Sequence, residues 1–384
     1  MASEAALTFA SSRDRAAELS FRMNRAINFS AGPGVVPEPV LEQAKQDLWD
    51  LFGSGIGILE HSPRGKESDR ALAEAEADRR AVGGIPDNYR VLFLQGGATT
   101  QAYQVPMAFL PDGRTADYFH TGKWATEAIH EAKRYGNVHV AAGSAETKFD
   151  RIPDDGDVRY SDHPAYVQFT SNNTLMGTEW HRMPPLPPGD AWFVCDASSD
   201  IFSRPIDVTQ FGFIYAGGQK NLGPAGTVLI IVRDDVLDRQ VRDLPWMLNY
   251  KVQAEKESRF NTPPTFGVYL MGQTFKWILA QGGLEAMRER NEAKSRIVYD
   301  ALDASGFYRP HARTQDRSHM NITFYTPSPE LDAKFIEQAD AAGLKNLKGH
   351  REVGGMRASM YNAFPHHGAE ALASFLRDFE AKHG

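Results

Sequence analysis

The sequence predicts an α/β fold with a largely parallel sheet, followed by a smaller α+β unit. From Asn28 onward, short runs of β-branched and aromatic residues alternate with longer segments of helical periodicity, and this alternation is typical of βαβ units. The chain has 384 residues and is 42% hydrophobic, which is enough to bury a large core and to form two domains.

Six strands are expected in the first part of the chain, because each is a short apolar run bounded by glycine, proline or polar residues. They are 90–94, 116–119, 165–170, 192–196, 213–216 and 227–232. A helix is expected from Pro39 towards Phe52, since proline suits the first helical turn. Another is expected over 67–82, which is rich in alanine and charge. The proline-rich stretches 183–189 and 261–264 are interpreted as rigid loops.

The pattern changes after a long helix expected over 287–305. The elements expected beyond it are a strand at 321–325, a helix at 330–342, a strand at 357–361 and a final helix. We therefore expect a large domain of residues 25–285, whose first residues pack with the small domain, and a C-terminal domain of residues 286–384. Residues 1–24 are expected to be an N-terminal extension, disordered or loosely helical, because its three acidic residues argue against a transit peptide.

Composition excludes several classes of partner. The chain has 42 basic and 49 acidic residues and a formal charge of −7, so it has no general attraction to nucleic acid or to an anionic membrane. No apolar stretch approaches the roughly 20 residues that span a bilayer. The single cysteine, Cys195, excludes an internal disulfide and favours a cytoplasmic location. No metal is expected, because His366 and His367 lack spaced carboxylate or cysteine partners.

Lys220 and Asp196 are the residues that indicate a chemistry. Lys220 follows an expected strand in the run Gly217-Gly-Gln-Lys220, and Asp196 ends the preceding strand, 24 residues earlier. A lysine amine can hold the aldehyde of pyridoxal 5'-phosphate (PLP) as a Schiff base, while a carboxylate keeps the pyridine nitrogen protonated. The pair predicts an enzyme that uses PLP.

Other motifs also follow expected strands, where open α/β folds bind ligands. The run Gln95-Gly-Gly-Ala-Thr99 opens a helix, so its amides could approach an anion, although Gly-Gly after a strand is often an ordinary turn. Trp124 begins another helix and could stack on a flat ring or fill the core. Asn173 and Thr174 could contact a ring substituent, although turn and cap residues are common at such positions.

A basic loop near the C-terminus suggests an anionic substrate. His350, Arg351 and Arg357 lie within eight residues, with glycines between them and an apolar strand after them. Arginine suits bidentate capture of carboxylate and phosphate, so a substrate bearing both groups is the natural inference. Arg64 adds another anion contact or is an ordinary exposed arginine.

In their order along the chain, from about residue 25 to the end, these motifs closely resemble the phosphoserine aminotransferase family, a branch of the fold-type I PLP-dependent aminotransferases. The runs that carry the resemblance are 28–33, 95–97, 170–174, 194–196, 217–224, 349–351 and 357–359. The resemblance implies reversible transamination of 3-phosphohydroxypyruvate with L-glutamate, giving O-phospho-L-serine and 2-oxoglutarate in serine biosynthesis. It also implies a homodimer with shared active sites. A further activity on phosphohydroxythreonine in pyridoxine biosynthesis stays open.

The same resemblance implies a role for each cofactor contact. Lys220 carries the Schiff base and moves the proton at the substrate α-carbon. Asp196 pairs with the pyridinium nitrogen, Trp124 stacks on the ring, and Thr174 contacts its phenolic oxygen. The cofactor phosphate is bound by Ala98, Thr99 and Gln219, and by Asn261 and Thr262 of the second copy.

Substrate contacts follow in the same way. Arg357 binds the α-carboxylate, and Arg64, His350 and Arg351 bind the distal phosphate or the side-chain carboxylate of glutamate. This chain departs from the family pattern at two positions. Pro63 stands where bacterial relatives carry histidine, and Thr99 where some carry arginine. Both departures reduce positive charge near a phosphate.

Three alternative functions stay open at this point. One is another small-molecule aminotransferase of the same fold, such as one using glyoxylate, but the basic loop favours an anionic distal group. A second is a cysteine desulfurase, for which only Cys195, expected to be buried, is available. The third is a PLP-binding regulatory or storage module without turnover, which the combination of Lys220 and a substrate loop disfavours.

Overall fold

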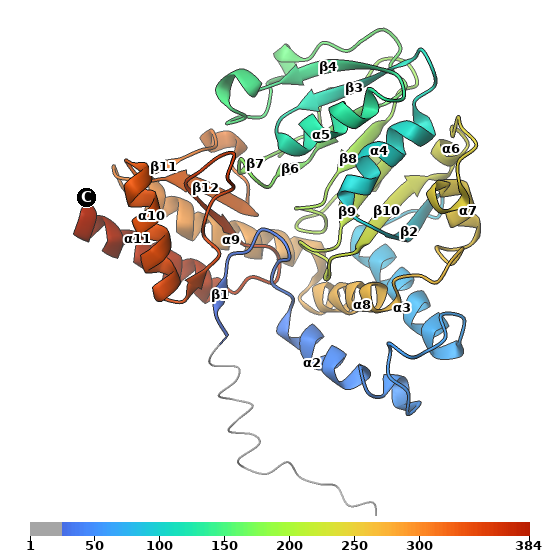
Figure 1. Cartoon of the computed structure of the whole chain (residues 1–384), viewed down its shortest axis with the longest axis horizontal. Helices are drawn as coiled ribbons and strands as arrows, with labels where there is room; N and C mark the ends of the chain where they lie inside the picture. The colour runs from blue at the N-terminus through green and yellow to red at the C-terminus, as the bar shows by residue number, and fades with distance from the viewer. Residues whose placement is uncertain (1–24) are drawn as a thin grey trace, which may run out of the picture.

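Two bodies make up the described part of the chain, residues 25–384 of the computed structural model. The expected extension, 1–24, lies outside the described residues. Figure 1 shows a larger body built around a central sheet and, beside it, a smaller body formed by the C-terminal elements. No helix of residues 25–384 has the length and apolar character needed to cross a membrane.

A seven-stranded sheet forms the centre of the larger body, with the strand order β2-β10-β9-β8-β5-β3-β4. Its strands are β2 (Tyr89–Gln95), β3 (Thr115–His120), β4 (Asn137–Gly143), β5 (Val167–Thr170), β8 (Phe193–Asp196), β9 (Phe213–Gly217) and β10 (Thr227–Arg233). All neighbouring pairs are parallel except those of β10, which runs antiparallel to β2 and β9. The six expected strands are confirmed, and the largely parallel sheet with them.

Helices cover both faces of this sheet, and β2 shows how the two faces divide. Leu92 and Leu94 join a core cluster with α4 (Ala98–Phe109) and α5 (Lys123–Ala132). Val91 and Phe93 join the opposite cluster, with α3 (Lys66–Gly83) and α8 (Thr265–Ala280). Strands buried on both faces lose the alternation of polar and apolar residues, and every residue of β5, β8 and β9 is buried.

The smaller body contains an antiparallel sheet of order β11-β12-β14. Its elements are α9 (Gly283–Asp303), β11 (Arg309–Pro310), β12 (Asn321–Tyr325), α10 (Pro329–Ala341), β13 (Leu344–Lys345), β14 (Met356–Ser359) and α11 (His366–His383). The strand β1 (Ile27–Asn28) pairs with β13, and Phe29 is buried in the core of this body. We propose that the two bodies are domains that meet near residue 285, at the start of α9.

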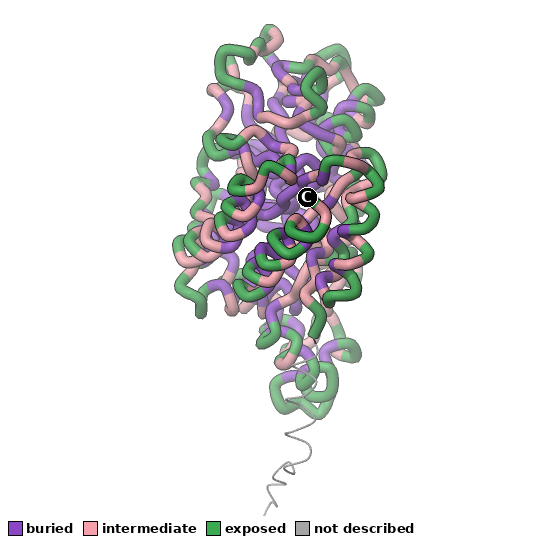
Figure 2. The backbone as a smooth tube through the Cα atoms, turned by 90° about the vertical axis from the view of Figure 1, so that its left-hand side faces the viewer, coloured by how far each residue is buried: buried purple, intermediate pink, exposed green. Residues whose placement is uncertain are grey.

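The remaining elements are short. They are α2 (Glu38–Asp47), β6 (Asn172–Asn173), β7 (Thr178–Glu179), α6 (Asp234–Leu237), α7 (Tyr250–Glu255) and the single turns 51–53, 145–147, 155–157, 208–210, 246–248 and 314–316. The helix expected from Pro39 towards Phe52 ends early, at Asp47, because Asp50 has an extended backbone conformation (φ −150°, ψ 87°) and leads into the turn at 51–53. Figure 2 shows that the segment around this turn projects from the body and is largely exposed.

Candidate active site

Lys220 lies at the carboxyl edge of the parallel strands, in the loop between β9 and β10. Its Nζ donates a hydrogen bond to Thr174 Oγ1 (2.7 Å) and lies 5.8 Å from the centre of the Trp124 ring. Asp196 ends β8, the strand next to β9, and is paired with Tyr215. The structure therefore brings Lys220, Asp196, Thr174 and Trp124 to one place.

Glycine at position 122 explains why Trp124 reaches this place. A Cβ atom on Gly122 would lie 2.8 Å from Asn173 Oδ1, so glycine lets α5 approach the segment after β5 closely without displacing that side chain. Trp124 follows two residues later, and 38% of its surface is exposed. A tryptophan with that much exposed surface beside a buried amine fits a partner that stacks on its ring.

The amine of Lys220 is tuned by burial. Burial lowers the pKa of Lys220 to about 8, Asp196 opposes this by favouring the charged amine, and Arg357 adds to the lowering. A lysine becomes nucleophilic when it loses its proton, so this environment prepares the amine for attack on an aldehyde near neutral pH.

We expect capture of PLP by the cofactor-free protein to show this pKa. The rate should rise with pH through about 8, because only the neutral amine attacks and burial has lowered the pKa of Lys220 to that value. Stopped-flow absorbance measures the rate, and capture of PLP by free N-acetyl-lysine is the control for titration of PLP itself. The prediction is wrong if the capture rate of the protein keeps rising with pH up to the ordinary lysine pKa, about 10.4, as the rate for N-acetyl-lysine does.

The Asp196 carboxylate is held in a fixed orientation by Ser198. Asp196 Oδ1 accepts hydrogen bonds from Ser198 N (3.0 Å) and Ser198 Oγ (2.6 Å), and Ser198 Oγ accepts one from Gly217 N (3.1 Å). Burial raises the pKa of Asp196, while Lys220 and the Ser198 hydrogen bonds lower it. A buried carboxylate of this kind needs a cationic partner, and a protonated pyridine nitrogen is such a partner.

The expected phosphate cradle lies at the same edge of the sheet. Gln95 pairs with Thr227 in β10, and Val228, the next residue, pairs with Gly217 of β9. This pairing places Ala98 and Thr99, in the first turn of α4, beside the loop that carries Gln219 and Lys220. The first amides of a helix are free to bind an anion and lie at the positive end of its dipole. These residues fit a cofactor phosphate.

Arg357 reaches the site from β14 of the smaller body. Among the described residues its Nε and Nη1 atoms are buried without a hydrogen-bond partner, and its charge lowers the pKa of Lys220. Burying an unpaired guanidinium is unfavourable. A ligand carboxylate would supply acceptors for this guanidinium, so Arg357 fits the sequence-based prediction.

The other expected substrate and cofactor residues lie in two groups. His350 and Arg351 lie on the turn before β14. Arg64, Asn261 and Thr262 line a separate hollow of about 470 Å³, and Thr262 O accepts a hydrogen bond from Gln95 Nε2 (2.9 Å). The proposed roles of Asn261 and Thr262 at the cofactor of a second copy need a dimer, and these roles and the substrate role of Arg64 stay predictions.

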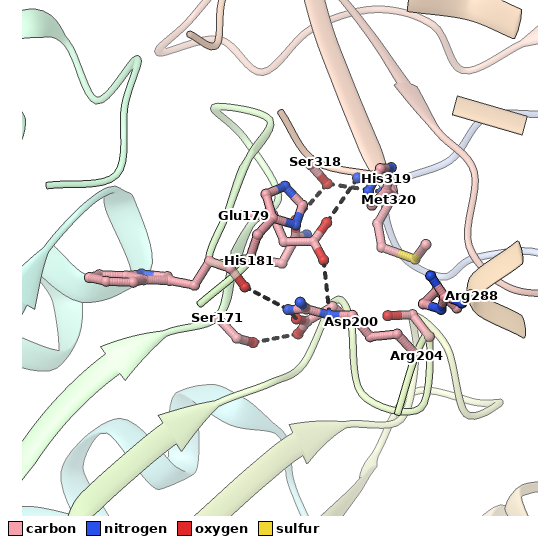
Figure 3. A network of polar contacts seen from close by, with 12 residues as sticks. Ser171, Glu179, His181, Asp200, Arg204, Arg288, Ser318, His319 and Met320 are labelled. Carbon is pink, nitrogen blue, oxygen red and sulfur yellow. Dashed lines mark hydrogen bonds and ion pairs between the residues drawn. The ribbon is translucent and has the colours of Figure 1, made fainter. Parts of the chain in front are cut away.

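A buried polar network supports the strand end that carries Asp196, and sequence reasoning missed it (Figure 3). Ser171 Oγ donates to Asp196 O (3.1 Å) and to a carboxylate oxygen of Asp200. Arg204 forms ion pairs with Asp200 (3.5 Å) and Glu179 (3.3 Å). Glu179 also accepts a hydrogen bond from the backbone of His319 in the smaller body (2.8 Å). The network therefore links the end of β8, which carries Asp196, to the smaller body.

The pH dependence of stability should reveal Asp200. Burial, reinforced by the charge of Glu179, raises the pKa of Asp200 to about 7 against the opposing charge of Arg204. Between about pH 4 and pH 7 the folded state keeps a proton that the unfolded chain has lost, so this contribution to stability is lost as pH rises through that window. Asp200→Asn removes the titration.

We therefore expect the melting temperature of Asp200→Asn, relative to the original protein, to increase from about pH 5 to about pH 8. Thermal unfolding of the two cofactor-free proteins in the same buffers measures this difference, since all other titrating groups are shared. A difference that stays constant over this range would show that Asp200 is ionised throughout.

One hydrogen bond joins the Lys220 loop to the smaller body, and the bonds of Lys294 hold the neighbouring segment within that body. Asn221 Oδ1, next to Lys220, accepts a hydrogen bond from Asn362 N (3.0 Å). Lys294 is buried in α9, and its Nζ donates to Tyr361 O (2.7 Å) and Met360 O (3.2 Å). These bonds hold the segment that follows β14, and with it Arg357, at a defined distance from the Lys220 loop.

Comparisons with known proteins show the family of the chain. The family model "Aminotransferase class-V" matches residues 26–372. The phosphoserine aminotransferase of Herpetosiphon aurantiacus is 48% identical over 358 residues, which cover 93% of this chain and 99% of the relative. That of Nitrosomonas europaea is 48% identical over 367 residues, covering 94% and 100%.

Solved structures give the same result. The phosphoserine aminotransferase from Bacillus circulans subsp. alkalophilus superposes with a TM-score of 0.91 at 43% identity, covering 94% of this chain and 99% of that one. The PLP-bound phosphoserine aminotransferase from Trichomonas vaginalis superposes with a TM-score of 0.88 at 36% identity, covering 92% and 100%. By sequence and by structure, this chain therefore belongs to the phosphoserine aminotransferase family, within the class-V aminotransferases.

Proposed function

We propose that the chain catalyses the reversible transfer of an amino group between L-glutamate and 3-phosphohydroxypyruvate, giving 2-oxoglutarate and O-phospho-L-serine. The observation that carries this proposal is the buried amine of Lys220, bonded to Thr174 and facing an arginine, Arg357, whose buried nitrogens lack partners among the described residues. When bound, PLP supplies an aldehyde for covalent attachment and a ring that accepts electrons from the substrate α-carbon.

The larger body supplies the proposed cofactor contacts. Asp196, held by Ser198, keeps the ring nitrogen protonated, and Trp124 covers one face of the ring. Thr174 donates or accepts at the ring oxygen through the hydroxyl that now contacts Lys220. The phosphate is bound by Ala98, Thr99 and Gln219, with Asn261 and Thr262 of the second copy.

The smaller body supplies the proposed substrate contacts. Arg357 binds the α-carboxylate and thereby orients the Cα–H bond towards Lys220, whose amine removes the proton and returns it during product formation. His350 and Arg351, together with Arg64, bind the distal phosphate or the glutamate side chain. A pocket with anion-binding side chains at both ends selects dicarboxylic and phosphorylated amino acids over alanine.

A second copy of the chain is the proposed partner. Large apolar side chains are exposed on a single chain: Trp49 is 82% exposed, Trp246 66% and Leu59 65%. Exposed apolar side chains of this size support a protein interface, and a dimer would bring the Arg64, Asn261 and Thr262 hollow to the neighbouring site. We place the activity in cytoplasmic serine biosynthesis.

Titration of the purified protein with PLP tests the proposal. O-phospho-L-serine, L-glutamate and L-alanine are added separately while the cofactor absorption spectrum is recorded. We expect the first two to convert bound cofactor to its amino form and alanine to leave the spectrum unchanged. A spectrum that ignores O-phospho-L-serine would refute the substrate assignment, and conversion by alanine would refute the proposed selectivity.

A further inference from the structure

We propose that Lys123 and Glu352 form an ionic latch that holds the substrate loop, residues 347–355, over the active site and so positions His350 and Arg351. This proposal rests on the proposed function, because the loop acts on a substrate only if His350 and Arg351 bind the distal anion of that substrate. Lys123 Nζ and Glu352 Oε1 lie 2.9 Å apart.

The tip of the substrate loop is held mainly by its own backbone. Val353 N and Gly354 N both donate to His350 O (2.9 and 2.8 Å), and Gly349 N donates to Gly355 O (2.9 Å). Gly354 and Gly355 have φ values of 78° and 61°, which glycine adopts without strain. These bonds define a compact turn but do not fix its position relative to the larger body. The Lys123–Glu352 pair supplies that connection.

The position of Lys123 makes the connection functional. Lys123 is the first residue of α5 and the immediate neighbour of Trp124, whose ring faces Lys220. Glu352 follows His350 and Arg351 in the loop. The ion pair therefore joins α5, which carries Trp124, to the loop that carries the anion-binding residues His350 and Arg351.

The local charge balance explains why the loop needs such a partner. Burial lowers the pKa of His350, and the charges of Arg357, Arg351 and Lys123 lower it further, whereas Glu352 raises it. Without Glu352, the cationic groups of Lys123, Arg351 and Arg357 would lie near one another with only Glu127, paired with Lys123, as compensation, and their repulsion would push the loop away from α5. Glu352 makes the contact between loop and helix attractive while leaving an excess of positive charge for an incoming anion.

An alternative explanation treats the two residues as independent charges. In that case Lys123 attracts the distal anion, Glu352 repels it, and the ion pair has no structural role. The two explanations differ in the sign of one effect. Glu352→Gln weakens binding of the distal anion if the pair is a latch and strengthens it if Glu352 acts only through repulsion.

A double-mutant cycle decides between them. The original protein, Lys123→Gln, Glu352→Gln and the double variant are compared by steady-state kinetics with O-phospho-L-serine and 2-oxoglutarate. Both side chains are partly exposed, with 25% and 42% of their surface accessible, so each substitution is compatible with folding. Exposed ion pairs have modest strength, so each single variant should raise KM for O-phospho-L-serine by about two- to fivefold, with kcat unchanged.

The double variant should bind no more weakly than either single variant, because the interaction is already lost in both. Glu127→Gln is the matched control. Glu127 is the other acid paired with Lys123 (3.2 Å), but it lies on α5 itself, so its replacement should leave KM unchanged. The cofactor spectrum should also be the same in all variants, since neither residue contacts the reacting atoms.

Three results would overturn the latch. A KM that falls in Glu352→Gln, or effects of the two single variants that simply add in the double variant, would show independent charges. A KM unchanged in both single variants would show that the pair does not position the loop. If the original protein fails to react with O-phospho-L-serine, the proposed function itself is wrong, and that outcome is visible before any variant is made.

Discussion

Lys220→Ala is expected to reduce turnover by at least about 10⁴-fold and to abolish covalent attachment of PLP. The amine of Lys220 is the group that both attaches the cofactor and moves the substrate proton, and its pKa, lowered to about 8, suits it to both tasks. Single-turnover kinetics with O-phospho-L-serine measure the loss, and borohydride reduction followed by mass spectrometry measures attachment.

Lys220→Arg provides the control for charge. Arginine restores the positive charge beside Asp196 but cannot act as a neutral amine, so it should remain as inactive as alanine. Partial recovery by arginine would show that the charge of Lys220 contributes more than its nucleophilicity. A Lys220→Ala protein that still turns over at the original rate would contradict the assignment of the catalytic lysine.

Arg357→Ala is expected to lower kcat/KM by roughly 10²- to 10³-fold for both O-phospho-L-serine and L-glutamate. Both amino acids present an α-carboxylate. The Nε and Nη1 atoms of Arg357 are buried without a hydrogen-bond partner in the described structure. Steady-state kinetics with each amino donor measure the effect. A loss confined to the phosphorylated substrate would instead place Arg357 at the distal anion.

A second readout separates binding from folding. Because the buried nitrogens of Arg357 lack partners among the described residues, its removal should not lower the melting temperature of the cofactor-free protein. Arg317→Ala is the contrasting variant, since Arg317 is paired with Asp303 (2.8 Å between Nη2 and Oδ1) far from the substrate loop in sequence. It should lower stability and leave kcat/KM near its original value.

The sequence predicted most of the central sheet because fully buried strands are short apolar runs with clear ends. It did not predict β4, an edge strand in which Asn137 and Val140 are exposed, since the pattern of an edge strand resembles that of a loop. It also did not predict α8, where residues 267–272 are buried without interruption. A helix covered on nearly every side lacks the periodicity that marks an amphipathic one.

The candidate site divides in the same way. Lys220, Asp196 and Arg357 were predicted because their residue types occur beside glycines and strand ends that suggest a chemistry. Ser198 supports Asp196 from two positions along the chain, and Arg204 pairs with Asp200 and with the more distant Glu179. Residue type alone indicates neither contact, so these positions required the structure.

The helix α9 gives the protein a shared mechanical element. Met287, near its start, packs in the core of the larger body, whereas Val298 and Leu302, near its end, pack in the core of the smaller one. Removing α9 would leave apolar surface open on both sides, so neither core is complete without it. The two bodies should therefore melt together in a single cooperative transition, even though we propose that they are two domains.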